Sequence, residues 1–231
     1  MNKREFINSL KGKIIDRIKK EGIHGLSKVL EEEKETYMQG VRSYGIKDSE
    51  QSWKPFKGKL LEEIIIESLA YEIEKLGLKI VKGSDLERRE DRLNECLAHI
   101  KRNLVVDYGE FGMHLPDADI VIYEPKTCKV LCIVSSKATL RERITQTGYW
   151  FLKLKGSKIT RNIKVFFITL DEDGDLIYKV PAKKGRAIVE VDTDGAFVIT
   201  NRNIEESKKV KKFEHFTEEL RSIIQRKDHN P

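Results

Sequence analysis

The chain has 231 residues, with 44 lysines and arginines against 38 aspartates and glutamates and a formal net charge of +6. This length suits one compact core with additional helices, or one core with a small appended subdomain, and it excludes a large multidomain machine. Because the two signs of charge nearly balance, a polyanionic partner is only weakly indicated, and any field that attracts one must be local.

The three cysteines are Cys96, Cys128 and Cys132, and only the last two are close in sequence. This odd number and spacing predict neither a disulfide framework nor a zinc site. The amino terminus has no apolar segment of the kind found in signal peptides, and no run approaches the roughly 18 apolar residues of a membrane span. We therefore expect a soluble, cytoplasmic protein with no membrane partner.

The first third of the chain predicts helices. Apolar residues recur at helical spacing from Phe6 to Ile18 and again from Leu26 onwards, which indicates two short helices ending near Tyr44. The polar segment 48–55 ends in proline and predicts a connection. We accordingly expect a helical amino-terminal subdomain over residues 1–50 and a main domain over 51–231.

The main domain is predicted to begin with a helix over 56–76, followed by a charged stretch and a second helix ending near Asn103. Strands over 118–123 and 129–134 flank a turn and predict a hairpin. A helix over 139–155 and a nearly all-apolar strand over 163–169 follow.

Further strands are expected at 176–180, 187–191 and 196–199, with a terminal helix over 205–226. The predicted fold is α/β, with a mixed sheet of about five strands and helices on both faces.

Acidic residues enter the first hairpin strand, and a lysine ends the second. Asp117 and Asp119 precede the apolar run Ile120-Val121-Ile122, and Lys137 follows Ser135-Ser136. In a hairpin these two strand ends can lie side by side. Phosphodiester hydrolysis needs a carboxylate that holds Mg²⁺ and a cation that stabilises negative charge, and an aspartate with a lysine provides both.

The order helix, hairpin, helix, strand, with an acid and a lysine at these strand ends, resembles the PD-(D/E)XK nucleases. Pro116-Asp117 matches the literal motif, whereas Asp119 precedes the apolar run as the family's aspartate does. Residues two positions apart in a strand point to the same face of the sheet. The alternation of side chains therefore does not decide whether Asp117 or Asp119 is the family's aspartate. We choose Asp119 as the catalytic and metal-binding aspartate, with Lys137 as the catalytic lysine.

Ser135 occupies the position where the motif has its second acid. A group of type II restriction endonucleases that cut CCGG and CCNGG sites resembles the chain here, because these enzymes have a small residue at this position and take a replacement acid from the following helix. Residues 149–152 contain no acid, so either Glu62 or Glu63 of the upstream helix carries the second carboxylate role or the site is built differently. We choose Glu62, whose distance from Gly58 resembles the family's spacing, as the second catalytic and metal-binding residue.

In that group the lysine is followed by an Arg-(Asp/Glu)-Arg element, which Arg141-Glu142-Arg143 reproduces. Arginine can donate two hydrogen bonds to guanine, and glutamate can accept one from cytosine in the same major groove. The resemblance implies a Mg²⁺-dependent type II site-specific deoxyribonuclease that reads a CC…GG site in double-stranded DNA as a homodimer. Whether dimers pair into tetramers is left open.

Other interpretations of these residues stay open. Thr139 and Glu142 also have the spacing of a capping box, which would only close a helix end. A repair or junction nuclease of the same fold would use Arg141 and Arg143 to bind phosphates rather than bases. A protein that lost its second acid at Ser135 would bind DNA without cutting it.

Overall fold

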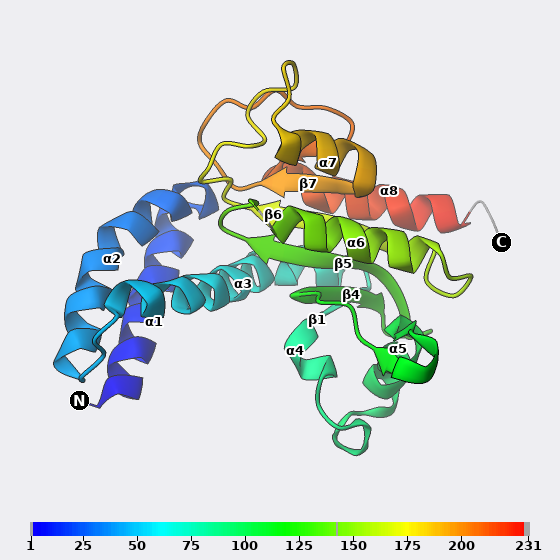
Figure 1. The fold of residues 1–231 in the computed structure, drawn as a ribbon, viewed down its shortest axis with the longest axis horizontal. Coiled ribbons are helices and arrows are strands. Elements are labelled where there is room, and N and C mark those ends of the chain that lie inside the picture. The colour runs from blue at the N-terminus through cyan, green and yellow to red at the C-terminus, as the bar shows by residue number, and fades with distance from the viewer. Residues whose placement is uncertain (1, 142, 229–231) are drawn as a thin grey trace.

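The structure is a computed structural model that describes residues 2–141 and 143–228. At its centre lies a six-stranded sheet in the order β1-β4-β5-β6-β7-β8 (Figure 1). Its strands are β1 (Lys79–Lys82), β4 (Ile120–Glu124), β5 (Lys129–Lys137), β6 (Lys164–Thr169), β7 (Gly195–Val198) and β8 (Val210–Lys212). The first three strands pair antiparallel, and β5 to β8 pair parallel. The predicted mixed α/β sheet is therefore confirmed, with six strands.

One face of the sheet is covered by helices from both ends of the chain. They are α1 (Lys3–Glu21), α2 (Leu26–Ser43), α3 (Ser49–Lys75) and α8 (Phe216–Asp228). Leu61, Ile65 and Leu69 of α3 pack in a core shared with the sheet, and each such buried side chain contributes about 1.5–3 kcal/mol. This packing fixes the position of helix α3 relative to the sheet.

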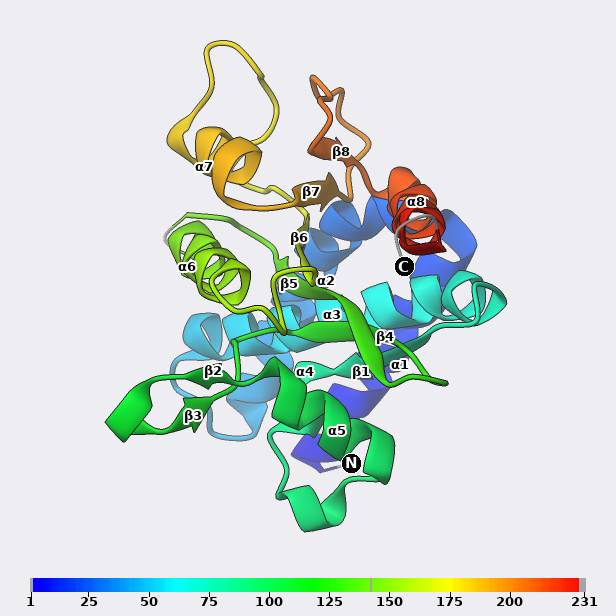
Figure 2. The same cartoon turned by 90° about the vertical axis from the view of Figure 1, so that its right-hand side faces the viewer.

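The opposite face is covered by α4 (Gly83–Leu86), α5 (Glu95–Leu104), α6 (Arg143–Lys155) and α7 (Lys184–Asp192). Figure 2 shows α6 and α7 on the side of the sheet away from α8, and a small hairpin that projects beside α5. The strands of this hairpin are β2 (Val106–Asp107) and β3 (Met113–His114).

The two expected amino-terminal helices are confirmed, but the predicted connection over 48–55 is wrong. The Asp48 side chain accepts a hydrogen bond from the Gln51 amide and caps α3, which begins at Ser49. Pro55 lies inside this helix. Residues 50 and 51 are therefore consecutive residues of one helix.

The predicted strand over 187–191 is also wrong, because these residues belong to α7. Arg186 is fully buried in this helix, and its guanidinium donates to the Leu176 and Glu205 carbonyls. These contacts and the burial of Val189 outweigh the strand preference of the β-branched residues.

No strand forms over 176–180, where Tyr178 and Val180 are exposed. Strands β1 and β8 were missed, and β8 replaces the first part of the expected terminal helix. Both are short, so they show little of the alternation that identifies longer strands.

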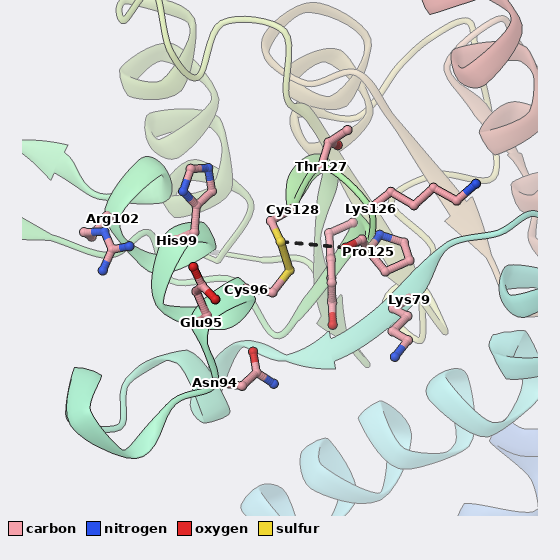
Figure 3. Close-up of a pocket in the computed structure, with 11 residues that line it drawn as sticks. Lys79, Asn94, Glu95, Cys96, His99, Arg102, Pro125, Lys126, Thr127 and Cys128 are labelled. Carbon is pink, nitrogen blue, oxygen red and sulfur yellow. Dashed lines mark hydrogen bonds between the residues drawn. A yellow bond between two sulfur atoms is a disulfide. The ribbon is translucent and has the colours of Figure 1, made fainter.

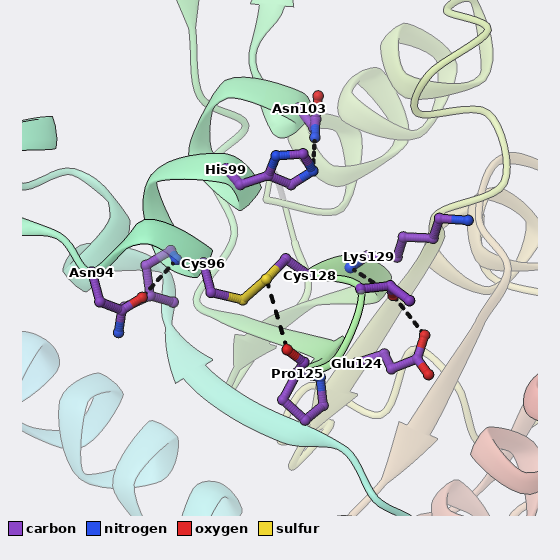
Figure 4. The surroundings of a disulfide bond; sticks show 10 residues. Asn94, Cys96, His99, Asn103, Glu124, Pro125, Cys128 and Lys129 are labelled. Atoms are coloured by element: carbon purple, nitrogen blue, oxygen red, sulfur yellow. Dashed lines mark hydrogen bonds between the residues drawn. A yellow bond between two sulfur atoms is a disulfide. The ribbon is translucent and has the colours of Figure 1, made fainter.

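Cys96 of α5 and Cys128 of the β4–β5 turn form a disulfide, with Cα atoms 5.4 Å apart (Figure 4). The prediction that no disulfide forms is therefore wrong, because the fold brings together two residues separated by 32 positions. Among the described residues no helix is long and apolar enough to cross a membrane.

Candidate active site at the ends of strands β4 and β5

Asp119 and Lys137 form an ion pair at one end of the central hairpin. The Lys137 ammonium donates to Asp119 Oδ2 over 2.7 Å, and the Ser136 amide donates to the same oxygen over 2.6 Å. The Asp119 side chain is 13% exposed and the Lys137 side chain is 12% exposed. The pair is therefore shielded from bulk water and still reachable from the surface.

The strand register explains why these residues meet. Ile120 pairs with Val134 across the hairpin, and the Asp119 amide donates to the Val134 carbonyl over 3.0 Å. Since the strands are antiparallel, the residue that enters β4 lies beside the last residues of β5.

Gly83 fixes the approach to Asp119 from the neighbouring strand. Its amide donates to the Asp119 carbonyl over 2.9 Å. A Cβ atom at position 83 would lie 1.7 Å from the Ala118 carbonyl oxygen, so only glycine allows this close approach. Sequence reasoning did not identify Gly83, because an isolated glycine before a charged stretch resembles an ordinary turn.

Asp117, the literal match to the family motif, lies elsewhere. It is exposed, and it accepts a hydrogen bond from Gln146 Nε2 of α6 over 2.7 Å. The structure thus brings Asp119 and Lys137 together and pairs Asp117 with a different helix.

Glu62 and Glu63 of α3 differ in their surroundings. Burial, and then the nearby Asp119 carboxylate, raise the pKa of Glu62 to about 7, while Lys137 and Lys82 partly oppose this. The Glu62 carboxylate makes no hydrogen bond or ion pair with a described residue. The charges of Asp119 and Lys137 thus both act on the Glu62 carboxylate.

The neighbouring Glu63 is already neutralised by two lysines. Its carboxylate lies 2.7 Å from the Lys11 ammonium and 3.4 Å from that of Lys82. Burial alone would raise the pKa of Glu63, but hydrogen bonds and charge from the two lysines lower it overall. Of the two glutamates, Glu62 is thus the one left available to a further cation.

The side chains at this edge fit a hard divalent cation. Asp119 and Glu62 offer carboxylate oxygens, which suit Mg²⁺ because this ion keeps several waters and needs only one or two protein carboxylates. Within the described parts of the chain no three His, Cys, Asp or Glu side chains form a group that could enclose a metal.

Two further observations bear on the missing second acid. Ser135 is buried in β5, and helix α6 contains no acidic residue. The Ser136 hydroxyl is buried and makes no hydrogen bond with a described residue. The site thus contains an unpartnered polar atom next to the amide that contacts Asp119.

The two arginines of the predicted base-reading element are exposed beside this site. Arg141 lies in the segment between β5 and α6 with a φ of 28°, and Arg143 is the first residue of α6. Glu142 lies outside the described residues. The structure describes α6 from Arg143 onwards, and the Ile144 amide donates to the Leu140 carbonyl over 3.1 Å. Because Glu142 is one of its two members, the capping box of Thr139 and Glu142 stays a prediction.

A separate hollow of about 480 Å³ lies at the opposite end of the hairpin (Figure 3). Its walls include the disulfide, His99 and Arg102 of α5, and Lys126 of the β4–β5 turn. No residue predicted for the active site lines it. This hollow is therefore distinct from the Asp119–Lys137 pair.

A family model described as BsaWI restriction endonuclease type 2 matches residues 96–219. This segment is more than half of the chain and includes Asp119, Lys137 and the segment 141–143. The chain belongs to the BsaWI restriction endonuclease family. Helix α3, which carries Glu62, lies outside the matched segment.

Relatives of this BsaWI-family protein extend over most of its length. It is 35% identical over 216 residues to MjaVIP of Methanocaldococcus jannaschii, whose name assigns it to the type II restriction enzymes, with 87% of this chain and 94% of the relative covered. It is 40% identical over 124 residues to HpyAORF263P of Helicobacter pylori, also named as a type II restriction enzyme, with 53% and 62% covered.

The fold has a counterpart among solved structures. The restriction endonuclease PspGI, in a complex with substrate DNA, superposes with a TM-score of 0.56 at 15% identity, and 95% of this chain and 93% of that chain are covered. The α/β fold of the PD-(D/E)XK type expected from the motif is therefore confirmed. The family model and the relatives confirm the resemblance to type II restriction endonucleases.

Proposed function

We propose that this BsaWI-family protein is a type II site-specific deoxyribonuclease that hydrolyses double-stranded DNA with Mg²⁺ at a CC…GG site. The observation that carries the proposal is the Asp119–Lys137 ion pair at 2.7 Å. The Asp119 charge also contributes to the raised pKa of the partly buried Glu62. Membership of a restriction endonuclease family supports the same reaction.

Asp119 and Glu62 are the residues that would hold the metal, and the bound ion would supply positive charge that polarises the phosphate and acidifies a water molecule. Lys137 contributes a cation that stabilises negative charge developing on the phosphate. The Ser136 amide holds Asp119 Oδ2 in place, so the carboxylate keeps its orientation while Lys137 turns toward the phosphate.

Recognition is assigned to the segment that follows Lys137. Arg141 and Arg143 are exposed, so both guanidinium groups are free to donate to guanine O6 and N7 in the major groove, with Glu142 accepting from cytosine. A homodimer would place two copies of this segment on the halves of a symmetric site.

The test is a digest of a plasmid of known sequence with purified protein and Mg²⁺, followed by sequencing of the fragment ends. We expect discrete fragments whose ends share one CC…GG sequence. The variants Asp119→Asn and Lys137→Met are expected to lose cleavage by about a hundredfold or more. The matched control Asp117→Asn is expected to cleave normally, since Asp117 contacts Gln146 rather than Lys137.

Other outcomes would identify a different function. Fragments that require branched or damaged DNA would favour a structure-specific nuclease. Binding without cleavage at any divalent metal concentration would favour a non-catalytic DNA-binding protein. Equal loss in Asp117→Asn and Asp119→Asn would contradict the assignment of the catalytic aspartate.

A further inference from the structure

Asp173, in the turn after β6, has a carboxylate without a hydrogen-bonding partner. Both of its oxygens are buried, neither forms a hydrogen bond with a described residue, and the side chain is 14% exposed. A charged carboxylate removed from water without donors is costly unless a cation lies nearby. The position therefore requires a cationic neighbour.

The turn that carries Asp173 is held in place by its neighbours. The Asp171 carboxylate accepts from the amides of Asp175 and Leu176 over 2.8 and 3.1 Å. The Lys183 ammonium donates to the Asp173 carbonyl over 3.1 Å. These bonds hold the backbone on both sides of Asp173, so the turn keeps the Asp173 carboxylate in this position.

Among the residues that the structure describes, Arg141 is the cation within 4.0 Å of the Asp173 carboxylate. Its Nε atom lies 3.9 Å from Asp173 Oδ2, which is an ion pair without a hydrogen bond, and its side chain is 77% exposed. One edge of the guanidinium is thus turned toward the buried carboxylate. The rest of the group remains open to a partner outside the protein.

The chain is arranged so that these two residues meet beside the active site. Strands β5 and β6 are parallel, with Lys137 opposite Thr169, and the Glu172 amide donates to the Ala138 carbonyl over 3.1 Å. Arg141 also has a φ of 28°, a conformation that is unfavourable for a residue other than glycine and is often found at functional sites.

We propose that Asp173 is a positioning residue that orients the Arg141 guanidinium for base recognition, an inference that rests on the proposed function. The carboxylate faces the Nε edge, and because 77% of the Arg141 side chain is exposed, the terminal amino groups are available to donate to a guanine. An arginine held in this way loses less side-chain freedom on binding and therefore discriminates better between base pairs.

The experiment compares Asp173→Asn, Arg141→Ala and the double variant. Dissociation constants are measured without divalent metal on a duplex with the site defined by the plasmid digest and on one with a single altered base pair. We expect Asp173→Asn to reduce the ratio of the two constants about tenfold, with no further loss when it is added to Arg141→Ala, since coupled residues are not additive.

The matched control is Asp175→Asn in the same turn. Asp175 Oδ1 lies 3.6 Å from the Lys183 ammonium, so this variant removes a nearby charge that does not face Arg141. It is expected to keep the wild-type ratio. If Asp173→Asn does not fold, as judged by urea unfolding, the smaller Asp173→Ser replaces it with the same expectation.

Failure of the inference is distinguishable from failure of the proposed function. A protein that cuts at discrete sites and loses discrimination in Arg141→Ala, but keeps it in Asp173→Asn, would overturn only the inference. A loss of stability without a change in the ratio would do the same. If the wild type does not discriminate between the duplexes, or if Arg141→Ala discriminates normally, the proposed base reading by Arg141 is wrong and the inference falls with it.

Discussion

The Lys137 ammonium lies 2.7 Å from Asp119 Oδ2, although 18 positions separate the two residues in sequence. Antiparallel pairing brings the start of β4 to the end of β5, and the Ser136 amide holds the same oxygen. Glu62 adds a second carboxylate from α3. Lys137 therefore offsets part of the repulsion between two acids.

Loss of the lysine is expected to destabilise the metal-free fold. In Lys137→Met the mostly buried Asp119 carboxylate has no cation paired with it, and we expect the free energy of unfolding to fall by about 1–3 kcal/mol. If Asp119 and Glu62 hold the metal, Mg²⁺ should stabilise this variant more than the wild type in urea unfolding. Lys126→Met, at the far end of the hairpin, is the control. An identical response of both proteins to Mg²⁺ would argue against the proposed metal ligands.

The raised pKa of Glu62 predicts a pH-dependent stability. The folded pKa of about 7 lies above the ordinary 4.5 because of burial and Asp119, so the folded protein holds this proton more tightly than the unfolded chain. The contribution to stability is full below pH 4.5 and is lost as pH rises through 7. Glu62→Gln is therefore expected to be more stable than wild type at pH 8 and similar to it at pH 4.5.

The size of this effect is limited because Glu62 is only partly buried. At about 1.4 kcal/mol per pH unit, and after reduction for solvent screening, we expect a gain of about 1–2 kcal/mol for Glu62→Gln in urea unfolding at pH 8. Glu63→Gln is the control and should have the opposite sign, because Lys11 and Lys82 lower the pKa of Glu63. If the unfolding free energies of the wild type and Glu62→Gln change with pH in the same way, the raised pKa of Glu62 is contradicted.

The close approach at Gly83 predicts a large effect from one methyl group. In Gly83→Ala the added Cβ would lie 1.7 Å from the Ala118 carbonyl oxygen, so the chain entering Asp119 must shift. We expect a loss of about 1–3 kcal/mol in unfolding free energy, together with a loss of plasmid cleavage that persists where the variant is fully folded. Gly12→Ala in α1, where a Cβ meets nothing within 4 Å, should cleave as wild type and gain about 0.5–1 kcal/mol in unfolding free energy, because alanine favours a helix interior.

Reduction of the disulfide is expected to lower stability without changing the site. The Cys96–Cys128 bond closes a loop of 32 residue positions, and such a loop corresponds to about 2–4 kcal/mol. Urea unfolding with and without reductant measures this loss, and Cys96→Ser should show no further effect of reductant. Cleavage by the folded reduced protein should be unchanged, because the bond lies at the opposite end of the hairpin. A fall in cleavage at full folding would show that the two ends are coupled.

Much of the fold follows from local patterns in the sequence. The central strands β4, β5 and β6 and the helices α1, α2 and α3 were predicted because apolar residues recur at the period of the element that buries them. The exceptions, such as α7, arise where a buried residue like Arg186 makes contacts that no local pattern records.

The candidate site likewise has parts that the sequence determined and parts that only the tertiary structure determined. The sequence alone determined the apolar strands, the acids that precede β4 and the lysine that ends β5, because these residues are neighbours along the chain. Only the tertiary structure showed that Lys137 contacts Asp119 while Gln146 contacts Asp117, and that Lys11 pairs with Glu63. Only it showed Gly83 against Ala118 and Asp173 against Arg141. These relationships depend on strand register and on the packing of distant segments, which bring together charges that are unrelated in sequence.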